Sequence, residues 1–327
     1  YKNLNEIIGR TDLLKQVSRG TSGLDDLDLS PLLVQADPGK NKRYCFSQNL
    51  INEVPDTLDE KIFTDIKNEI DKKNKIQLNY KIKNVHRAVG TRLSHYIYKK
   101  FGIEKIHENF ITINLSGSAG QSLGAFGIKG LKLNVTGDAN DYVGKGLSGA
   151  TIVIKPPQES NLISNENTII GNTVLYGATS GKLFAAGQSG ERFAVRNSGA
   201  EAVVEGCDSN GCEYMTGGCV VILGKVGDNF AAGMTGGMAF IYDPTQDFVN
   251  YVNSKSVIWQ IPETDYWKNY LKNLISEHFK ETKSKISEKI LSNFNYELKN
   301  FKQVCPKEML DKLEYSITTK TKVSKAV

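Results

Sequence analysis

The stretch that decides the fold runs from residue 199 to residue 242 and reads GAEAVVEGCDSNGCEYMTGGCVVILGKVGDNFAAGMTGGMAFIY. Within it a glycine opens a short apolar segment three times, at Gly199, Gly218 and Gly237, with a step of 19 residues. Earlier glycines open similar segments: Gly130-LKLNV, Gly149-ATIVI and Gly181-KLFAA. The steps are 19, 32, 18, 19 and 19 residues, and the long one contains a 13-residue insert, KPPQESNLISNEN, after Ile154.

This fixed period predicts a repeat fold built from short strands. Self-similarity at a constant interval marks solenoids, and short strands joined by glycine-rich corners are typical of a parallel β-helix. We therefore expect a mainly β fold, a single-stranded right-handed parallel β-helix of about six or seven turns with flanking α-helices. The expected boundaries are an amino-terminal flank of mixed structure at 1–108, the β-helix at 109–243 and a helical carboxy-terminal flank at 244–327.

The residues after each glycine predict which face each side chain takes. Side chains on a strand point alternately to opposite faces, so we expect the first, third and fifth residues inside the coil. They are apolar in five repeats, as at Cys219, Val221 and Leu223, whereas Lys182 breaks the pattern in another. The fourth residue is also apolar in most repeats, and a sheet that is apolar on both faces is normally covered on both. We therefore expect the flanks or another domain to bury the outside of the coil.

The flanks contain their own periodic segments. Strict alternation of apolar and polar residues predicts a strand at 76–82. Apolar residues then recur every four positions and predict an amphipathic helix that ends at Gly102: Val85, Val89, Leu93, Ile97 and Phe101. Residues 264–300 again have helical periodicity. Because the two ends of a β-helix are open sheet edges, we expect the flanking helices to cap them.

Composition argues against several classes of function. The 327 residues carry a formal net charge of +5 without the concentrated basic face that nucleic acids require, and no apolar run approaches the roughly 20 residues of a membrane span. The five cysteines show neither a disulfide framework nor the CxxC spacing of most metal sites: Cys45, Cys207, Cys212, Cys219 and Cys305. We therefore expect a reducing compartment, no nucleic acid, no membrane and no metal. Because the chain starts at Tyr1 without a methionine, we also expect a fragment of a longer polypeptide.

No pattern in the sequence predicts a catalytic, cofactor-binding or metal residue. The GxGxxG at 144–149 and the GxSxG at 120–124 both lack the helix that must follow such motifs. Six glycines are expected to shape the corners: Gly130, Gly149, Gly181, Gly199, Gly218 and Gly237. Four charged residues are expected to make turn or interdomain contacts: Asp141, Arg192, Arg196 and Glu213. The alternative for such turn charges is a carbohydrate-active β-helix enzyme, which the apolar outward positions disfavour.

Several long blocks of the sequence carry a family resemblance. They are GSAGQSLGAFGIKGLKLNVTGDANDYVGKGLSGA at 117–150, IIGNTVLYGATSGKLFAAGQSGERFAVRNSGAEAVVEG at 169–206, GCEYMTGG at 211–218 and GDNFAAGMTGGMAFIYD at 227–243. The flanks add IIGRTDLL at 7–14, LDLSPLL at 27–33, VHRAVGTRLS at 85–94 and LISEHFKETKS at 274–284. Together they resemble the carboxy-terminal GXGXG domain of the glutamate synthase large subunit over nearly the whole chain. Cys207 and Asn210 depart from the family pattern, and the insert after Pro157 is longer than in some relatives.

The resemblance implies a part in glutamate biosynthesis and ammonia assimilation. The family enzyme is an oxidoreductase that makes two glutamates from glutamine, 2-oxoglutarate and a reductant. Its amidotransferase domain releases ammonia, which an FMN-binding barrel with a 3Fe–4S cluster uses. This chain resembles neither centre, so the resemblance implies a structural domain without cofactors of its own that positions the other domains and is inactive alone.

The partners implied are the other domains of the large subunit, with a small reductase subunit or ferredoxin as the electron donor. The compartment implied is the cytoplasm or a plastid. A different possibility is a free-standing assembly protein, because a related β-helix occurs as one component of formylmethanofuran dehydrogenase. The GERFAVRNSGA and CEYMTGG blocks favour glutamate synthase.

Overall fold

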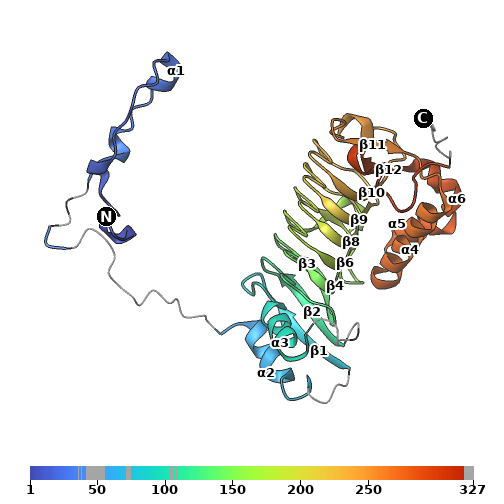
Figure 1. Cartoon of the computed structure of the whole chain (residues 1–327). Coiled ribbons are helices and arrows are strands. Elements are labelled where there is room, and N and C mark those ends of the chain that lie inside the picture. Colours follow the sequence, from blue (N-terminus) through green and yellow to red (C-terminus); the bar gives the residue numbers. More distant parts are fainter. Residues whose placement is uncertain are drawn as a thin grey trace. The chain divides into compact units, whose positions relative to one another are not determined.

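The computed structural model describes residues 1–35, 37, 39–41, 56–70, 75–102, 107 and 110–319. These fall into two compact units, Tyr1–Pro55 and Asp56–Val327. The described part of the first unit contains the short helix α1 (Ser22–Asp25) and single 3-10 turns at Leu4–Glu6, Thr11–Leu13 and Ser30–Leu32 (Figure 1). No side chain whose exposure is described in this unit is buried.

The second unit is built around one large, mainly parallel sheet (Figure 1). Within the described residues the strands pair in the order β1-β2-β3-β4-β6-β8-β9-β10-β12-β11, with β5 beside β3 and β7 beside β5. The pairings are parallel, except that β12 runs antiparallel to β10 and to β11. The strands are β1 (Ile76–Ile82), β2 (Ile111–Ala119), β3 (Leu131–Ala139), β4 (Ser148–Lys155), β5 (Thr168–Ile170), β6 (Ser180–Ala185), β7 (Gln188–Ser189), β8 (Ser198–Val204), β9 (Thr216–Ile222), β10 (Gly236–Tyr242), β11 (Val257–Gln260) and β12 (Phe301–Pro306).

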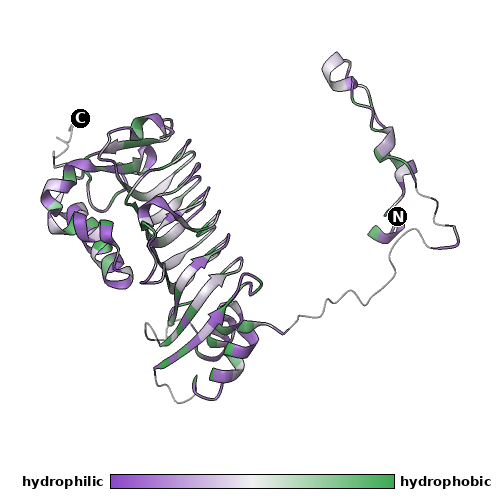
Figure 2. Ribbon diagram, turned by 180° about the vertical axis from the view of Figure 1, so that it is seen from behind, coloured by the Kyte–Doolittle hydropathy of each residue, from purple (hydrophilic) through white to green (hydrophobic). Residues whose placement is uncertain are grey.

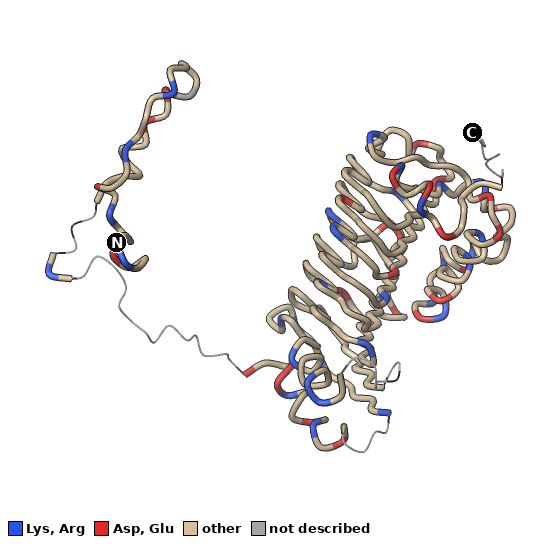
Figure 3. The backbone as a smooth tube through the Cα atoms, in the orientation of Figure 1, with Lys and Arg blue, Asp and Glu red and all other residues tan. Residues whose placement is uncertain are grey.

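Of the described helices of this unit, one precedes β1 in the chain, one lies between β1 and β2, and three lie between β11 and β12. They are α2 (Leu58–Ile66), α3 (Thr91–Phe101), α4 (Asp265–Thr282), α5 (Lys285–Ser292) and α6 (Phe294–Glu297). The predicted strand at 76–82 is confirmed, and α3 ends before Gly102 as expected. Helix α3 begins later than expected, at Thr91, because Gly90 has the left-handed conformation. Val85, which was predicted to lie on the apolar face of this helix, therefore lies outside the helix and is 71% exposed. Figure 2 shows hydrophilic and hydrophobic residues mixed on the flanking helices, and Figure 3 shows charges concentrated there.

Consecutive strands pair residue by residue, and this register decides the two faces of the sheet. Lys132 pairs with Thr151, Thr151 with Lys182, and Lys182 with Glu201, so these polar side chains share one face. Glu201 then pairs with Cys219 and Cys219 with Met238, because the register shifts at the glycines that open these strands. Since side chains alternate between faces, a shift of one residue moves a whole strand's apolar set to the other face.

The predicted assignment of faces is therefore correct in some repeats and wrong in others. One face packs against the side chains of the corners, and we call it the corner-side face; it carries Ile152, Leu183, Ala202, Val220 and Ile241. The opposite face, the helix-side face, carries Val153, Phe184, Val203, Cys219, Val221, Leu223, Met238, Phe240 and Tyr242. Phe184 and the helix-side residues from Cys219 onward were expected inside the coil. Lys182 does not break the alternation, because it points to the helix-side face.

The carboxy-terminal flank covers the helix-side face. Helix α4 lies against β4, β6, β8 and β9 (Figure 1). Its Leu271, Leu274 and Ile275 are buried in the same apolar cluster as Phe184 and Phe240. The expectation that the chain's own flank buries this face is confirmed for these strands, and the helix explains why both faces can be apolar.

The expectation that helices cap the sheet is confirmed at the β1 end and is wrong at the β10 end. At the β1 end, Ile66 of α2 and Leu93 of α3 join the corner-side core, as a helical cap should. The carboxylate of Asp59 ties α2 to α3 by accepting hydrogen bonds from the backbone N–H groups of Gly90, at 2.8 Å, and Arg92, at 2.7 Å. At the β10 end the antiparallel pair β12 and β11 continues the sheet instead of a helix.

The corner glycines stand where a larger residue has no room. Gly218 has φ +80°, and a Cβ there would lie 2.3 Å from the carbonyl oxygen of Ala200. Gly199 lies outside the left-handed region, but a Cβ there would lie 2.1 Å from the carbonyl oxygen of Thr179. In both cases the obstacle is the backbone of the preceding repeat, in β8 for Gly218 and next to the start of β6 for Gly199, and it cannot move without disturbing the strand pairing.

We predict that Gly218→Val lowers the free energy of unfolding by about 3 kcal/mol or more, because it combines a β-branched residue at positive φ with a backbone clash. Urea unfolding followed by circular dichroism measures the loss. Gly177→Ala is the matched control: Gly177 has φ +64° but no heavy atom within 4 Å of its Cβ position, so it should cost only about 1 kcal/mol. Equal effects of the two substitutions would contradict the steric part of the explanation.

Candidate functional site

Each corner that leads into a strand repeats one backbone conformation. Three alternate residues have positive φ, and the residues between them do not. The sets are Ser122, Gly124 and Phe126; Tyr142, Gly144 and Gly146; Thr173, Leu175 and Gly177; Arg192, Ala194 and Arg196; Asn210, Cys212 and Tyr214; Asn229, Ala231 and Gly233. A left-handed conformation costs an L-residue roughly 1–2 kcal/mol, so something must compensate for the many residues here that are not glycine.

Hydrogen bonds between neighbouring corners supply that compensation. The N–H groups of Arg192 and Arg196 donate to the carbonyls of Ser209 and Glu213 in the next corner, each at 2.9 Å. The N–H group of Ala194 donates in the opposite direction, to Val174 in the preceding corner, at 2.9 Å. Corners in the middle of the row are thus tied to both neighbours by hydrogen bonds between backbone groups.

Three of the four residues predicted to make turn contacts lie together on two neighbouring corners. The guanidinium Nε of Arg192 lies 3.1 Å from Oε2 of Glu213. The guanidinium of Arg196 lies over the ring of Tyr214, 5.7 Å from its centroid. Asp141 serves a different corner, where its Oδ1 accepts a hydrogen bond from the backbone N–H of Asn172 at 2.8 Å. All four therefore connect one corner to the next.

A polar groove of about 470 Å³ lies where the start of the helix-side face meets α4. Charged side chains from strands and helix pair across it: Nζ of Lys132 lies 2.6 Å from Glu281, and Nζ of Lys182 lies 2.6 Å from Glu277 and 3.4 Å from Glu201. The lysines and glutamates that face each other satisfy one another's charge. The groove thus holds α4 in place and offers no unpaired charge of these residues to a ligand.

Where α4 meets α5, a buried polar cluster was not expected from the sequence. Glu205 and His278 have no exposed surface, and His278 Nε2 lies 3.6 Å from Glu205 Oε1. Ser284 donates its hydroxyl to the same oxygen and accepts the backbone N–H of Ser287 at 3.2 Å, which caps α5. Because Glu205 lies far from the other three residues in the sequence, no local pattern could have brought them together.

The buried cysteines are packing residues. Burial raises the pKa of the Cys207 thiol to about 12, and burial also raises the pKa values of Cys212 and Cys219 well above the usual range. A thiol is a nucleophile or metal ligand only when it is deprotonated. No group of three or more histidine, cysteine or acidic residues in the described part of the chain is placed to hold a metal ion. Nor does any described helix have the length and apolar composition needed to cross a bilayer.

We predict that Thr173→Gly stabilises the protein by about 1 kcal/mol, because it relieves a β-branched residue at φ +58°. Thermal unfolding should show the increase. Thr112→Gly is the matched control, since Thr112 lies within β2, where glycine should instead destabilise by about 1 kcal/mol. A loss of stability in both variants would show that the corner does not strain Thr173.

We further predict that Ser284→Ala lowers the free energy of unfolding by about 2 kcal/mol, because it removes both the helix cap and the hydrogen bond to buried Glu205. Ser287→Ala should change it by less than about 1 kcal/mol, because the buried Ser287 hydroxyl has no hydrogen-bond partner to lose. Chemical unfolding of the two variants makes the comparison. If Ser287→Ala costs as much as Ser284→Ala, the cap and the Glu205 bond are not what stabilises this junction.

Comparison with known proteins identifies the family. The model of the GXGXG motif family matches residues 59–307. The chain is 59% identical over 317 residues to the glutamate synthase [NADPH] large chain of Azospirillum brasilense, covering 97% of this chain and 21% of that protein. It is 43% identical to the glutamate synthase [NADH] of Schizosaccharomyces pombe and 40% identical to the chloroplastic ferredoxin-dependent glutamate synthase of Spinacia oleracea, covering 96% and 97% of this chain and 15% and 20% of those proteins.

The chain thus spans about a fifth of the length of the curated relatives it matches. The matched part includes both the repeated corners and the flanks that close the sheet. Such identity over nearly the whole chain leaves no ambiguity about descent. The protein belongs to the glutamate synthase large-chain family, of which it carries the GXGXG region.

Proposed function

We propose that the parallel strands and their corners form a single-stranded, right-handed parallel β-helix of about six or seven turns. The order of pairing supports this, because each main strand from β2 to β10 lies beside the next main strand in the sequence. The corners stack in the same order through the hydrogen bonds between their backbones. Strand residues such as Ile152 and corner residues such as Val143 share one continuous core, as the inside of such a coil requires.

We further propose that this β-helix is a structural, non-catalytic part of glutamate synthase. The parent would convert glutamine, 2-oxoglutarate and a reductant to two glutamates, and this part would hold its amidotransferase and FMN domains in position. The observation that carries the proposal is that the charged side chains of the polar groove and of the neighbouring corners at Arg192 and Glu213 pair within the chain. For example, Lys182 forms ion pairs with Glu201 and Glu277. Likewise, Arg192 forms an ion pair with Glu213.

The cofactors of the parent do not fit the residues of this chain. A 3Fe–4S cluster needs thiolate ligands, whereas Cys207, Cys212 and Cys219 are buried thiols whose pKa values burial raises. The glycine-rich corners lead into strands and not into the helix whose amino terminus would hold a phosphate. We therefore assign FMN, the cluster and the chemical steps of the reaction to the rest of the parent polypeptide.

The partners that follow are the other domains of the large chain, and a small reductase subunit or ferredoxin as electron donor. Exposed corner residues such as Arg192 and Arg196 would contact neighbouring domains while they also join one corner to the next. The names of the relatives include NADPH, NADH and ferredoxin. A cytoplasmic or plastid location agrees with the chloroplastic relative.

We predict that purified chain 1–327 releases no flavin in stoichiometric amount on denaturation and has no glutaminase or glutamate synthase activity. Absorbance spectroscopy and a glutamate assay test this. The positive control is the native full-length polypeptide, purified in the same way. Bound flavin in a one-to-one ratio, or turnover by the 327-residue chain, would contradict the structural role.

A further inference from the structure

Residues 1–35, the longest described part of the amino-terminal unit, carry apolar side chains that they do not bury. The exposed ones are Tyr1, Leu4, Ile7, Ile8, Leu13, Leu14, Val17, Leu27, Leu32 and Val34, and Leu32 is 77% exposed and Leu14 64%. Scattered exposed apolar residues are normal on a folded surface. Here ten of 35 residues are exposed and apolar. Because none of the described side chains in this segment is buried, the segment has no hydrophobic core of its own to stabilise its fold.

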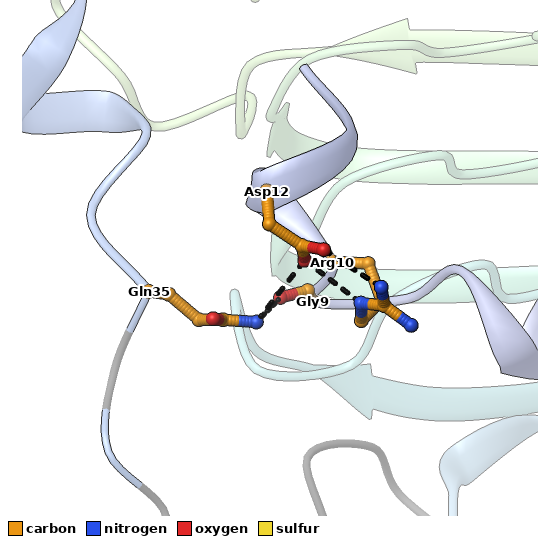
Figure 4. Close-up of polar contacts among 4 residues, drawn as sticks. All are labelled: Gly9, Arg10, Asp12 and Gln35. Atoms are coloured by element: carbon orange, nitrogen blue, oxygen red, sulfur yellow. Dashed lines mark hydrogen bonds and ion pairs between the residues drawn. The ribbon is translucent and has the colours of Figure 1, made fainter.

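Polar contacts give this unit a defined local shape despite the missing core. The carboxylate of Asp12 accepts two hydrogen bonds of 2.7 Å from the guanidinium of Arg10, and the side-chain amide of Gln35 donates to the carbonyl of Gly9 at 3.2 Å (Figure 4). Gln16 makes a second cross-link, donating to the carbonyl of Leu27 and accepting from the backbone N–H of Leu29. These contacts join the beginning of the unit to its end, and exposed hydrogen bonds of this kind contribute only modestly to stability.

A third cross-link lies at the turn between the two halves of the unit. Asp25 accepts hydrogen bonds from the Ser18 hydroxyl at 2.7 Å and from the backbone N–H groups of Arg19 and Gly20 at 2.9 and 3.1 Å. Several polar side chains therefore make contacts within the unit, while the apolar side chains named above remain exposed. That is the reverse of a domain that folds for itself, and it leaves the apolar side chains for contact with another surface.

The charge of the unit excludes a strongly charged partner. Residues 1–35 contain four basic and five acidic side chains: Lys2, Arg10, Lys15 and Arg19 against Glu6, Asp12, Asp25, Asp26 and Asp28. Binding to nucleic acid or to an anionic membrane surface would need an excess of basic residues. The chemistry of these residues instead fits an uncharged, apolar protein surface, to which the aliphatic side chains would contribute most of the binding energy.

The relatives point to where that surface lies. The GXGXG family model begins only at residue 59, so it leaves out the amino-terminal unit. The Azospirillum relative aligns over 317 of the 327 residues, so at most ten residues lie outside the alignment and most of this unit is shared. In that relative, the corresponding segment is part of a polypeptide about five times as long as this chain, since the alignment covers 21% of the relative.

We propose that residues 1–35 form a docking arm whose apolar side chains bury themselves in an apolar surface of the remaining part of the large chain. The arm would anchor the β-helix to that part through residues other than those of the corners. This inference rests on the proposed function, because it needs a longer parent polypeptide.

Cysteine labelling tests the arm in the protein as it exists. Leu14→Cys and Leu32→Cys are introduced singly into the native full-length polypeptide and into chain 1–327, and the rate of reaction with N-ethylmaleimide at each site is followed by mass spectrometry. We expect both sites to react at least about tenfold more slowly in the full-length polypeptide, since burial by docking protects a side chain unless the contact opens. The matched control is Asp26→Cys, an exposed polar position of the same unit, which should change by less than about threefold.

Each other outcome would overturn the proposal. Equal rates in the two polypeptides would show that the remaining part of the large chain does not cover the arm. Protection in chain 1–327 that grows with protein concentration would mean that a second copy covers it, and protection by phosphatidylcholine vesicles would mean a lipid surface. Equal protection of the Asp26→Cys site would show that the burial is not selective for apolar residues. Chain 1–327 without flavin or activity, combined with an unprotected arm, would reject the arm and leave the structural role intact.

Discussion

Hydrogen bonding between backbones in successive corners is the interaction on which this structure depends. In most corners two N–H groups donate to the following repeat and a third donates to the preceding one, as those of Arg192, Arg196 and Ala194 do. This arrangement requires left-handed residues at alternate positions. Their conformational free-energy cost is offset because the backbone hydrogen bonds replace hydrogen bonds with water. Stability is thus shared among neighbours, as in other repeat proteins, and the strands, the core and the covering helix all follow from corners that stack.

Much of the fold could be predicted from the sequence because regularly spaced glycine and apolar residues mark the repeat. The 19-residue period indicated parallel neighbouring strands, and the apolar fourth residues, such as Val153 and Val203, indicated that a second face would be covered. The strand at 76–82 and the end of α3 at Gly102 followed from alternation and from a helix-terminating glycine. These are local signals, and each one acts through the nearest residues of the chain.

What could not be predicted depends on relations between distant residues. The shift that pairs Glu201 with Cys219 is a property of two strands together, so counting from the glycine put Val221 and Phe240 on the wrong face. The left-handed residues of the corners were missed because most of them are not glycine; Thr173 and Ala194 look ordinary. Of the candidate site, the turn residues could be named from the sequence, but the buried contact of Glu205 with His278 needs α4 in place.

The register shifts have a consequence for how the family can change in length. One residue added where a strand begins would exchange the side chains that meet α4 with those that meet the core, so selection should remove such changes. The 13 inserted residues follow Ile154, the last apolar residue of β4 that pairs with β6. The insert therefore leaves the pairing of β4 with β6 intact. Insertions and deletions should therefore accumulate in evolution at the strand ends, while the glycine-opened starts keep a constant length.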